Sequence, residues 1–156
     1  MLKNKKIAVL GATGHIAKGL IYNFSRYDYK NVFLFARSLP RLGNFLKEIN
    51  CENSWSKKGF DGFRRHDYDV IINCVGLGTP SKVKECGRDV FFLTEYFDNM
   101  ILEYLTNHKK TLYINFSSGA VYGTDFTVPA GDSTFSKWNI NNIKESDYYG
   151  IAKLNS

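Results

Sequence analysis

A tyrosine and a lysine lie four residues apart, a spacing that could support proton transfer. They are Tyr149 and Lys153. On a helix, this spacing places both side chains on one face. A nearby ammonium favours the phenolate and lowers the tyrosine pKa from its usual value of about 10. Tyr149 could then act as an acid and base near neutral pH. Tyr-x-x-x-Lys alone is common, so its meaning depends on the neighbouring sequence.

A pair of serines precedes this tyrosine in the segment 115–123, which contains Ser117 and Ser118. The segment leaves the carboxyl end of a predicted strand, where open α/β sheets bind their ligands. A serine hydroxyl at this place can donate a hydrogen bond to a substrate oxygen while Tyr149 transfers the proton. The alternative is a turn in which both serines act as caps.

A glycine-rich turn near the start of the chain has the spacing of a dinucleotide-binding loop. Gly11 permits a tight turn, Gly14 lets backbone N–H groups approach a pyrophosphate, and Ala17 permits close packing of helix on sheet. The pyrophosphate would lie on the positive N-terminus of the following helix. The alternative is a tight turn without a ligand. We predict cofactor contacts from Gly11, Thr13, Gly14, His15 and Ile16.

The residues after the second strand indicate which dinucleotide is preferred. An acidic residue there would bind the adenosine ribose and repel a 2′-phosphate. The chain has Arg37 and Ser38 instead. We therefore predict NADP in preference to NAD, with NAD still possible. The alternative is that Arg37 only stacks on adenine or is solvated.

Alternating strand-like and helix-like segments must position these residues. Ile7 to Leu10 is a continuous apolar run, and the next apolar residues recur with helical spacing. Buried apolar strands separated by helices predict an α/β fold with a parallel sheet in the order 3-2-1-4-5. The other predicted strands are 31–36, 53–56, 69–75 and 111–117, the other helices are 39–49 and 89–107, and 124–146 is a predicted loop.

The long helix 89–107 has apolar residues on more than one face. Phe92 and Tyr96 lie beside the face that would cover the sheet. A helix that is apolar on two sides must be covered on two sides. Either another part of the chain or another subunit covers the second side, and we predict a homodimer through this helix.

Composition limits the remaining classes of function. The 156 residues suit one domain, 1–156, and the net charge of +6 is scattered, which favours a solvated basic face over a nucleic-acid surface. No apolar run reaches the ~20 residues of a membrane span. The three cysteines lack metal-ligand spacing, so we expect no metal. Their odd number without a signal peptide predicts reduced thiols in the cytoplasm, and Cys74 in its apolar run is expected to be an inert core residue.

Four motifs together resemble the extended short-chain dehydrogenase/reductase superfamily, in its NAD(P)-dependent epimerase/dehydratase branch. They occur in the family's order and are Gly-Ala-Thr-Gly at 11–14, Asp-Val-Ile-Ile-Asn-Cys-Val-Gly at 69–76, Ser-Ser-Gly-Ala-Val-Tyr-Gly at 117–123, and Tyr149 with Lys153. The resemblance implies a Rossmann-type doubly wound sheet. It also implies a hydroxyl-bearing small-molecule substrate, expected to be a nucleotide sugar.

The resemblance implies roles for individual residues. Ser118, with Ser117 as the fallback, would be the catalytic serine and Tyr149 the acid/base. Lys153 would hold the nicotinamide ribose and lower the tyrosine pKa. The residues that would border the adenosine and its ribose are Asn73, Cys74, Val75 and Gly76.

The sequence departs from the family pattern in three ways. The third glycine of the phosphate loop is Ala17, and Leu93 and Thr94 replace an asparagine of the long helix. Family members also continue well past Tyr-x-x-x-Lys into a substrate lobe. We favour a fragment of a longer protein over a truncated product that binds cofactor poorly and turns over little. We expect the 156-residue chain to be catalytically incompetent, with Tyr149 and Lys153 displaced or loosely held and too far apart for the lysine to tune the phenol. The alternative function is a non-catalytic NADP(H)-binding regulator or scaffold.

Overall fold

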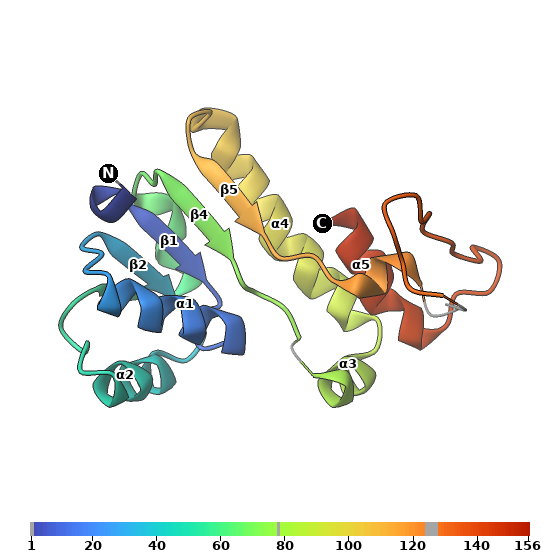
Figure 1. The fold of residues 1–156 in the computed structure, drawn as a ribbon, viewed down its shortest axis with the longest axis horizontal. Coiled ribbons are helices and arrows are strands. Elements are labelled where there is room, and N and C mark those ends of the chain that lie inside the picture. The colour runs from blue at the N-terminus through green and yellow to red at the C-terminus, as the bar shows by residue number, and fades with distance from the viewer. Residues whose placement is uncertain (1, 78, 124–127) are drawn as a thin grey trace. The chain divides into compact units, whose positions relative to one another are not determined.

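The apolar runs of the sequence form one parallel sheet. The computed structural model describes residues 2–77, 79–123 and 128–156. All neighbouring strands pair in parallel in the order β3-β2-β1-β4-β5, which confirms the predicted α/β class and topology (Figure 1). The strands are β1 (Ile7–Leu10), β2 (Val32–Phe35), β3 (Ser56–Lys58), β4 (Val70–Asn73) and β5 (Leu112–Asn115).

The chain divides into two compact units, which we describe separately. The sheet unit comprises residues 1–75 and 102–115, and the helical unit comprises 76–101 and 116–156. The α-helices are α1 (His15–Arg26), α2 (Leu39–Glu48), α3 (Pro80–Cys86), α4 (Asp89–Asn107) and α5 (Tyr148–Asn155). The prediction of a single domain over 1–156 stays a prediction.

The predicted elements are found with small shifts. Helix α4 has the predicted bounds, whereas β3 begins three residues later than predicted and α3 was not predicted. The 3-10 helices are η1 (Leu2–Asn4), η2 (Phe60–Arg65), η3 (Gly119–Tyr122) and η4 (Glu145–Asp147). Within the described ranges, no helix is both long and apolar enough to cross a membrane.

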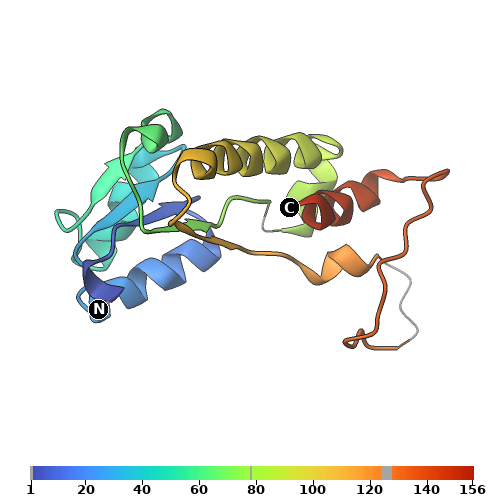
Figure 2. The same ribbon diagram turned by 90° about the horizontal axis from the view of Figure 1, so that it is seen from above.

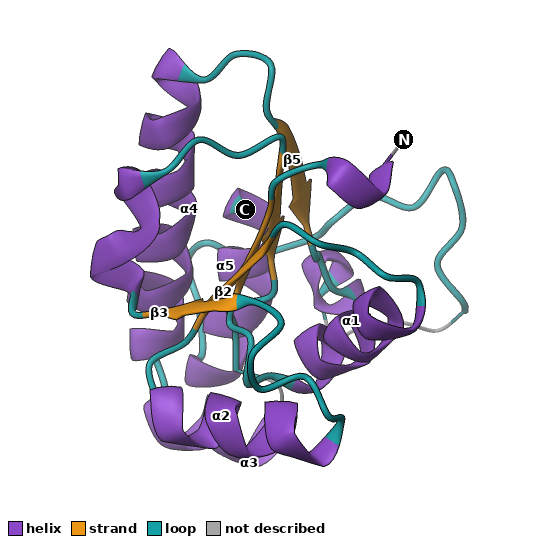
Figure 3. Cartoon of the chain, turned by 90° about the vertical axis from the view of Figure 1, so that its left-hand side faces the viewer, coloured by secondary structure: helices purple, strands orange, loops and turns teal. Residues whose placement is uncertain are grey.

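Helices cover both faces of the central strands in the sheet unit. Figures 2 and 3 show α1 on one face and residues 102–107, the end of α4, on the other. Every residue of β1 and β4 is therefore buried. On the α4 side, a cluster of aromatic rings fills the core. Phe63 stacks on Tyr68 with ring centroids 5.4 Å apart, and the ring centroids of Tyr104 and Tyr68 are 5.6 Å apart.

The edge strand β5 differs from the continuously buried strands. Leu112 is 57% exposed and Ile114 37% exposed, whereas Val70 and Ile72, their partners on β4, are buried. This alternation is that of a strand with one face packed on the unit and the other open to solvent. The apolar composition of the segment predicted a strand but did not predict that one of its faces is open.

A carboxylate links the starts of the two central strands. Asp69 precedes β4 and accepts hydrogen bonds from Lys5 Nζ at 2.7 Å and from the Lys6 backbone N–H at 2.8 Å. The Lys5 side-chain bond, followed by the Lys6 bond, lowers the pKa of Asp69. Both bonds favour the ionised carboxylate, and the two lysines lie directly before β1.

Replacing Asp69 by asparagine should therefore reduce stability in a pH-dependent way. A carboxylate whose pKa is lower in the folded chain stabilises it fully above the unfolded-state pKa of about 3.9, and this stabilisation is lost as pH falls through the folded value. For an exposed ion pair we expect about 0.2–1 kcal/mol near neutral pH. Thermal unfolding of the unmutated chain and of Asp69→Asn, at neutral and acidic pH, measures this difference in the free energy of unfolding. A difference that persists in strong acid would contradict the prediction.

Candidate active site and cofactor loop

The turn between β1 and α1 requires glycine at its first position. Gly11 has φ +75°, a left-handed backbone conformation that side chains disfavour. A Cβ at Gly11 would also lie 2.8 Å from the backbone oxygen of Cys74. The Gly14 N–H donates to the Gly11 carbonyl at 2.8 Å and closes the turn. The turn is therefore fixed by backbone geometry at Gly11.

The start of α1 fits an anionic ligand. Gly14 is the N-cap and supplies no side-chain oxygen, and the first turn contains no acidic residue. The first N–H groups of a helix have no partner within the helix, and the helix dipole places positive charge there. His15 and Ile16 are exposed, and Thr13 is half-buried. These residues fit the pyrophosphate of a dinucleotide.

The exit of β2 presents the two residues predicted to select the cofactor. Arg37 is exposed, and Ser38 is the N-cap of α2. The Ser38 hydroxyl oxygen accepts from the Arg41 N–H at 3.4 Å. A hydroxyl has one hydrogen and two acceptor positions, so Ser38 keeps its hydrogen for donation. Capping of α2 is a structural role that the sequence interpretation did not include.

The residues after β4 are held by local hydrogen bonds. Asn73 is buried, and its Oδ1 accepts from the Val75 N–H at 3.1 Å while its Nδ2 donates to the Tyr113 hydroxyl at 3.3 Å. Burial raises the pKa of Cys74 to about 11. The Cys74 thiol therefore stays protonated at neutral pH, as expected for an inert residue.

In the helical unit, the predicted catalytic serine begins a 3-10 turn. Ser118 is the half-buried N-cap of η3, and its Oγ accepts from the Ala120 N–H at 3.2 Å. The capping alternative therefore holds for Ser118. It leaves the hydroxyl hydrogen available, because capping uses only an acceptor position. Ser117, the fallback, is exposed.

Lys153 is buried and held. Its side chain lies in the helical unit, where it is 7% exposed and its Nζ donates to the Phe116 carbonyl at 3.1 Å. A Cβ on Gly76 would be 4.0 Å from the same Nζ. Burial lowers the pKa of Lys153, and the negative charge of Asp98 raises it. The expectation of a loosely held lysine was wrong, because burial and the Phe116 bond fix the side chain.

A second glycine brings α5 against η3. A Cβ on Gly150 would lie 2.5 Å from the Ala120 oxygen and 2.4 Å from the Trp138 ring. Gly150 directly follows Tyr149, and Ala120 is two residues from Ser118. This close approach therefore sets how the tyrosine helix packs on the serine turn. The sequence interpretation missed both Gly150 and Trp138, whose importance depends on contacts distant in the sequence.

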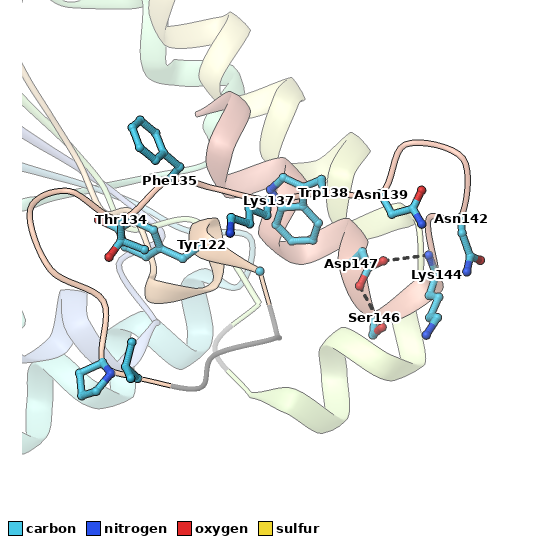
Figure 4. A pocket seen from close by; sticks show the side chains of 13 residues that line it. Tyr122, Thr134, Phe135, Lys137, Trp138, Asn139, Asn142, Lys144, Ser146 and Asp147 are labelled. Atoms are coloured by element: carbon cyan, nitrogen blue, oxygen red, sulfur yellow. Dashed lines mark hydrogen bonds between the residues drawn. The ribbon is translucent and has the colours of Figure 1, made fainter.

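A pocket of about 470 Å³ lies beside these elements in the helical unit (Figure 4). Its lining includes Tyr122 of η3, Trp138 and Lys137 of the following segment, and Asp147 of η4. Figure 4 also shows the Lys144 backbone N–H donating to Asp147, at 3.0 Å. Ser118, Tyr149 and Lys153 are not among the described residues that line this pocket.

Comparison with protein families gives a match over nearly the whole chain. The model of the NAD dependent epimerase/dehydratase family matches residues 7–156. The chain belongs to this family. The match includes the glycine turn, Ser118, Tyr149 and Lys153, and it confirms the resemblance inferred from the four motifs. No sequence among the curated proteins matches the chain.

Solved structures share the family's dinucleotide-binding fold. The UDP-Glc/GlcNAc 4-epimerase from Campylobacter jejuni has a TM-score of 0.75 and 16% identity over 97% of this chain and 46% of its own. The UDP-glucose 4-epimerase from Bifidobacterium longum, in complex with NAD⁺ and UDP, has a TM-score of 0.74 and 18% identity over 96% of this chain and 46% of its own. The GDP-mannoheptose C4 reductase from Campylobacter jejuni, with NADP bound, has a TM-score of 0.66 and 16% identity over 99% of this chain and 42% of its own. The chain spans less than half the length of each.

Proposed function

We propose that this member of the NAD dependent epimerase/dehydratase family is the cofactor-binding part of an oxidoreductase acting on a hydroxyl-bearing substrate, a nucleotide sugar. The carrying observation is the buried Lys153, held by Phe116 and located four residues after Tyr149 on α5. A buried cation on the same helical face as a tyrosine suits proton transfer. The sugar-nucleotide enzymes among the solved relatives support the substrate class.

The proposed chemistry uses three side chains of the helical unit. Tyr149 takes the proton of the substrate hydroxyl, and Ser118 donates a hydrogen bond to the same oxygen. The ammonium of Lys153 stabilises the phenolate of Tyr149. A bound nicotinamide cofactor supplies the hydride acceptor and donor. Epimerisation or dehydration would leave the cofactor in its starting oxidation state. Reduction of a carbonyl would consume reduced cofactor, and Tyr149 would then donate its proton to the carbonyl oxygen.

Replacing Tyr149 by phenylalanine should remove the proton-transfer group and leave the helix intact. We expect turnover of the full natural protein to fall by about 10²-fold or more. Tyr148→Phe is the matched control, because it removes the same hydroxyl from the adjacent half-buried residue. Carbonyl reduction and nucleotide-sugar epimerisation are measured for both variants. Equal turnover in the two would contradict the role of Tyr149. No turnover in the unmutated protein, with cofactor binding retained, would instead favour a non-catalytic NADP(H)-binding role.

We also propose that NADP(H) binds more tightly than NAD(H), because the exposed Arg37 supplies positive charge at the exit of β2. Arg37→Asp should reverse this preference, since a carboxylate repels a 2′-phosphate and accepts from the ribose hydroxyls. Calorimetric titration of both cofactors into the 156-residue chain measures the change. Arg41→Asp in α2 is the control for a general charge effect. Equal affinities before mutation would contradict the role of Arg37.

A homodimer through α4 remains part of the proposal. Phe92 is 61% exposed and Tyr96 63% exposed, one helical turn apart. Two large aromatic residues facing solvent are suited to an interface. Light scattering should give a dimer for the protein and a monomer for the Phe92→Asp variant. A monomer before mutation at micromolar concentration would contradict it.

The three free cysteines support the proposed cytoplasmic location.

A further inference from the structure

Two charged side chains are buried in the described part of the chain, and they have opposite signs. Asp98 of α4 is 6% exposed, and Lys153 of α5 is 7% exposed. Both belong to the helical unit. A buried charge without compensation is strongly destabilising, so buried charges are normally paired or hydrogen-bonded. The two burials therefore need a common explanation.

Hydrogen bonding ties Asp98 to the same turn of α5 that carries Lys153. Ser156 Oγ donates to Asp98 Oδ2 at 2.7 Å. Ser156 follows Lys153 by three residues, and its N–H donates to the Ala152 carbonyl at 3.2 Å, which continues the helical turn. Residues three apart lie on the same side of a helix. The lysine side of α5 thus faces the Asp98 carboxylate.

Lys153 has a second anchor away from α4. Its Nζ donates to the Phe116 carbonyl at 3.1 Å, which is a neutral acceptor. A single carbonyl bond satisfies one of the three ammonium hydrogens and adds no negative charge. The compensating charge for the ammonium must come from elsewhere. The effect of Asp98 on the Lys153 pKa, opposite to that of burial, has the required sign.

We propose that Asp98 is a positioning residue for Lys153. Its carboxylate, oriented by Ser156, keeps the buried lysine in the ammonium form and holds the last turn of α5 beside α4. Only the catalytic consequence of this proposal rests on the proposed function, in which Lys153 must be charged to stabilise the Tyr149 phenolate. The electrostatic coupling itself is a property of this chain without ligand.

The test is a titration of the Lys153 side chain by NMR in the 156-residue chain, with the signal identified by its loss in Lys153→Arg. Asp98→Asn keeps the shape and removes the charge, so the Lys153 titration midpoint should move to lower pH. Glu95→Gln is the matched control, because it removes one negative charge from the same helix. Its midpoint should stay at the wild-type value. Asp98→Glu should restore most of the shift.

A structural role alone would give a different result. It predicts that Asp98→Asn lowers the unfolding temperature but leaves the Lys153 titration midpoint equal to the midpoint in Glu95→Gln. This outcome would overturn the proposal. If Asp98→Asn does not fold, Ser156→Ala replaces it. That variant retains both charges but removes the Ser156 hydrogen bond that orients the carboxylate, so the midpoint should move in the same direction by less. An unchanged midpoint would overturn the proposal. Neither readout needs cofactor or turnover, so failure of the proposed catalysis would be seen separately in Tyr149→Phe.

Discussion

Replacing Gly150 by alanine is expected to disrupt the packing of α5 on η3. The added Cβ would lie 2.5 Å from a backbone oxygen, that of Ala120, and 2.4 Å from the Trp138 ring. The Ala120 oxygen belongs to a turn capped by Ser118 and has little freedom to move. Forcing extra atoms into a packed site costs about 1–3 kcal/mol. We therefore expect the helical unit to lose stability and Tyr149 to lose its fixed position relative to Ser118.

Gly19→Ala in α1 is the matched control for this prediction. A Cβ on Gly19 meets nothing within 4 Å. Alanine inside a helix is favoured over glycine by roughly 0.5–1 kcal/mol, so this variant should gain stability. The two tryptophans separate the units, because Trp138 contacts the Gly150 site and Trp55 binds the Tyr29 carbonyl in the sheet unit. Unfolding followed by Trp138 fluorescence, in a Trp55→Phe background, should show a loss for Gly150→Ala. A Trp138 unfolding transition that Gly150→Ala leaves unchanged would show that the approach is looser than the structure indicates.

Replacing Gly11 by alanine should disable the cofactor loop. Alanine at φ +75° costs about 1–3 kcal/mol, and its Cβ would lie 2.8 Å from the Cys74 carbonyl oxygen. The turn must then open, which displaces the N–H groups at the start of α1. We expect cofactor affinity to fall at least about tenfold, equivalent to 1.4 kcal/mol. Calorimetric titration of NADPH into the 156-residue chain measures the loss.

Gly14→Ala separates the effect on binding from the effect on stability. Gly14 has φ −75°, which any residue adopts, and its Cβ would lie 3.1 Å from the Gly11 oxygen. This variant should keep more stability than Gly11→Ala but still bind cofactor weakly, because the methyl group occupies the space where a pyrophosphate approaches. Gly19→Ala again serves as the control with unchanged binding. Full cofactor affinity in Gly11→Ala would contradict the assigned role of the loop.

Local sequence determined the elements whose pattern is strong and repeated. The apolar run at Ile7–Leu10 and the long helix Asp89–Asn107 were predicted with the observed bounds, because burial and helical period recur over their length. The glycine turn was predictable because its backbone geometry admits so few residue types. The lysine of Tyr-x-x-x-Lys was predicted as a candidate site residue from its spacing and its family context, and this role stays a prediction.

Other elements follow from pairing rather than pattern. Strand β3 has the residues Ser56, Lys57 and Lys58, which carry no strand signal, and it forms because its backbone pairs with Phe33–Phe35 of β2. Helix α3 has seven residues, too few for a helical period to repeat clearly. The open face of β5 depends on which elements pack over that strand, which the residues of the strand alone do not determine.

The tertiary structure alone decided the environment of the candidate catalytic residues. Asp98 is one of four acidic residues of α4, and its link to α5 through Ser156 joins residues 58 positions apart. The Phe116 carbonyl that holds Lys153 is 37 positions away. Burial and charge compensation are set by such distant contacts, because they depend on which groups exclude water from the ammonium. The sequence by itself determined that a tyrosine, a lysine and a serine are present in the family's order, and the fold decided that the lysine is buried and held.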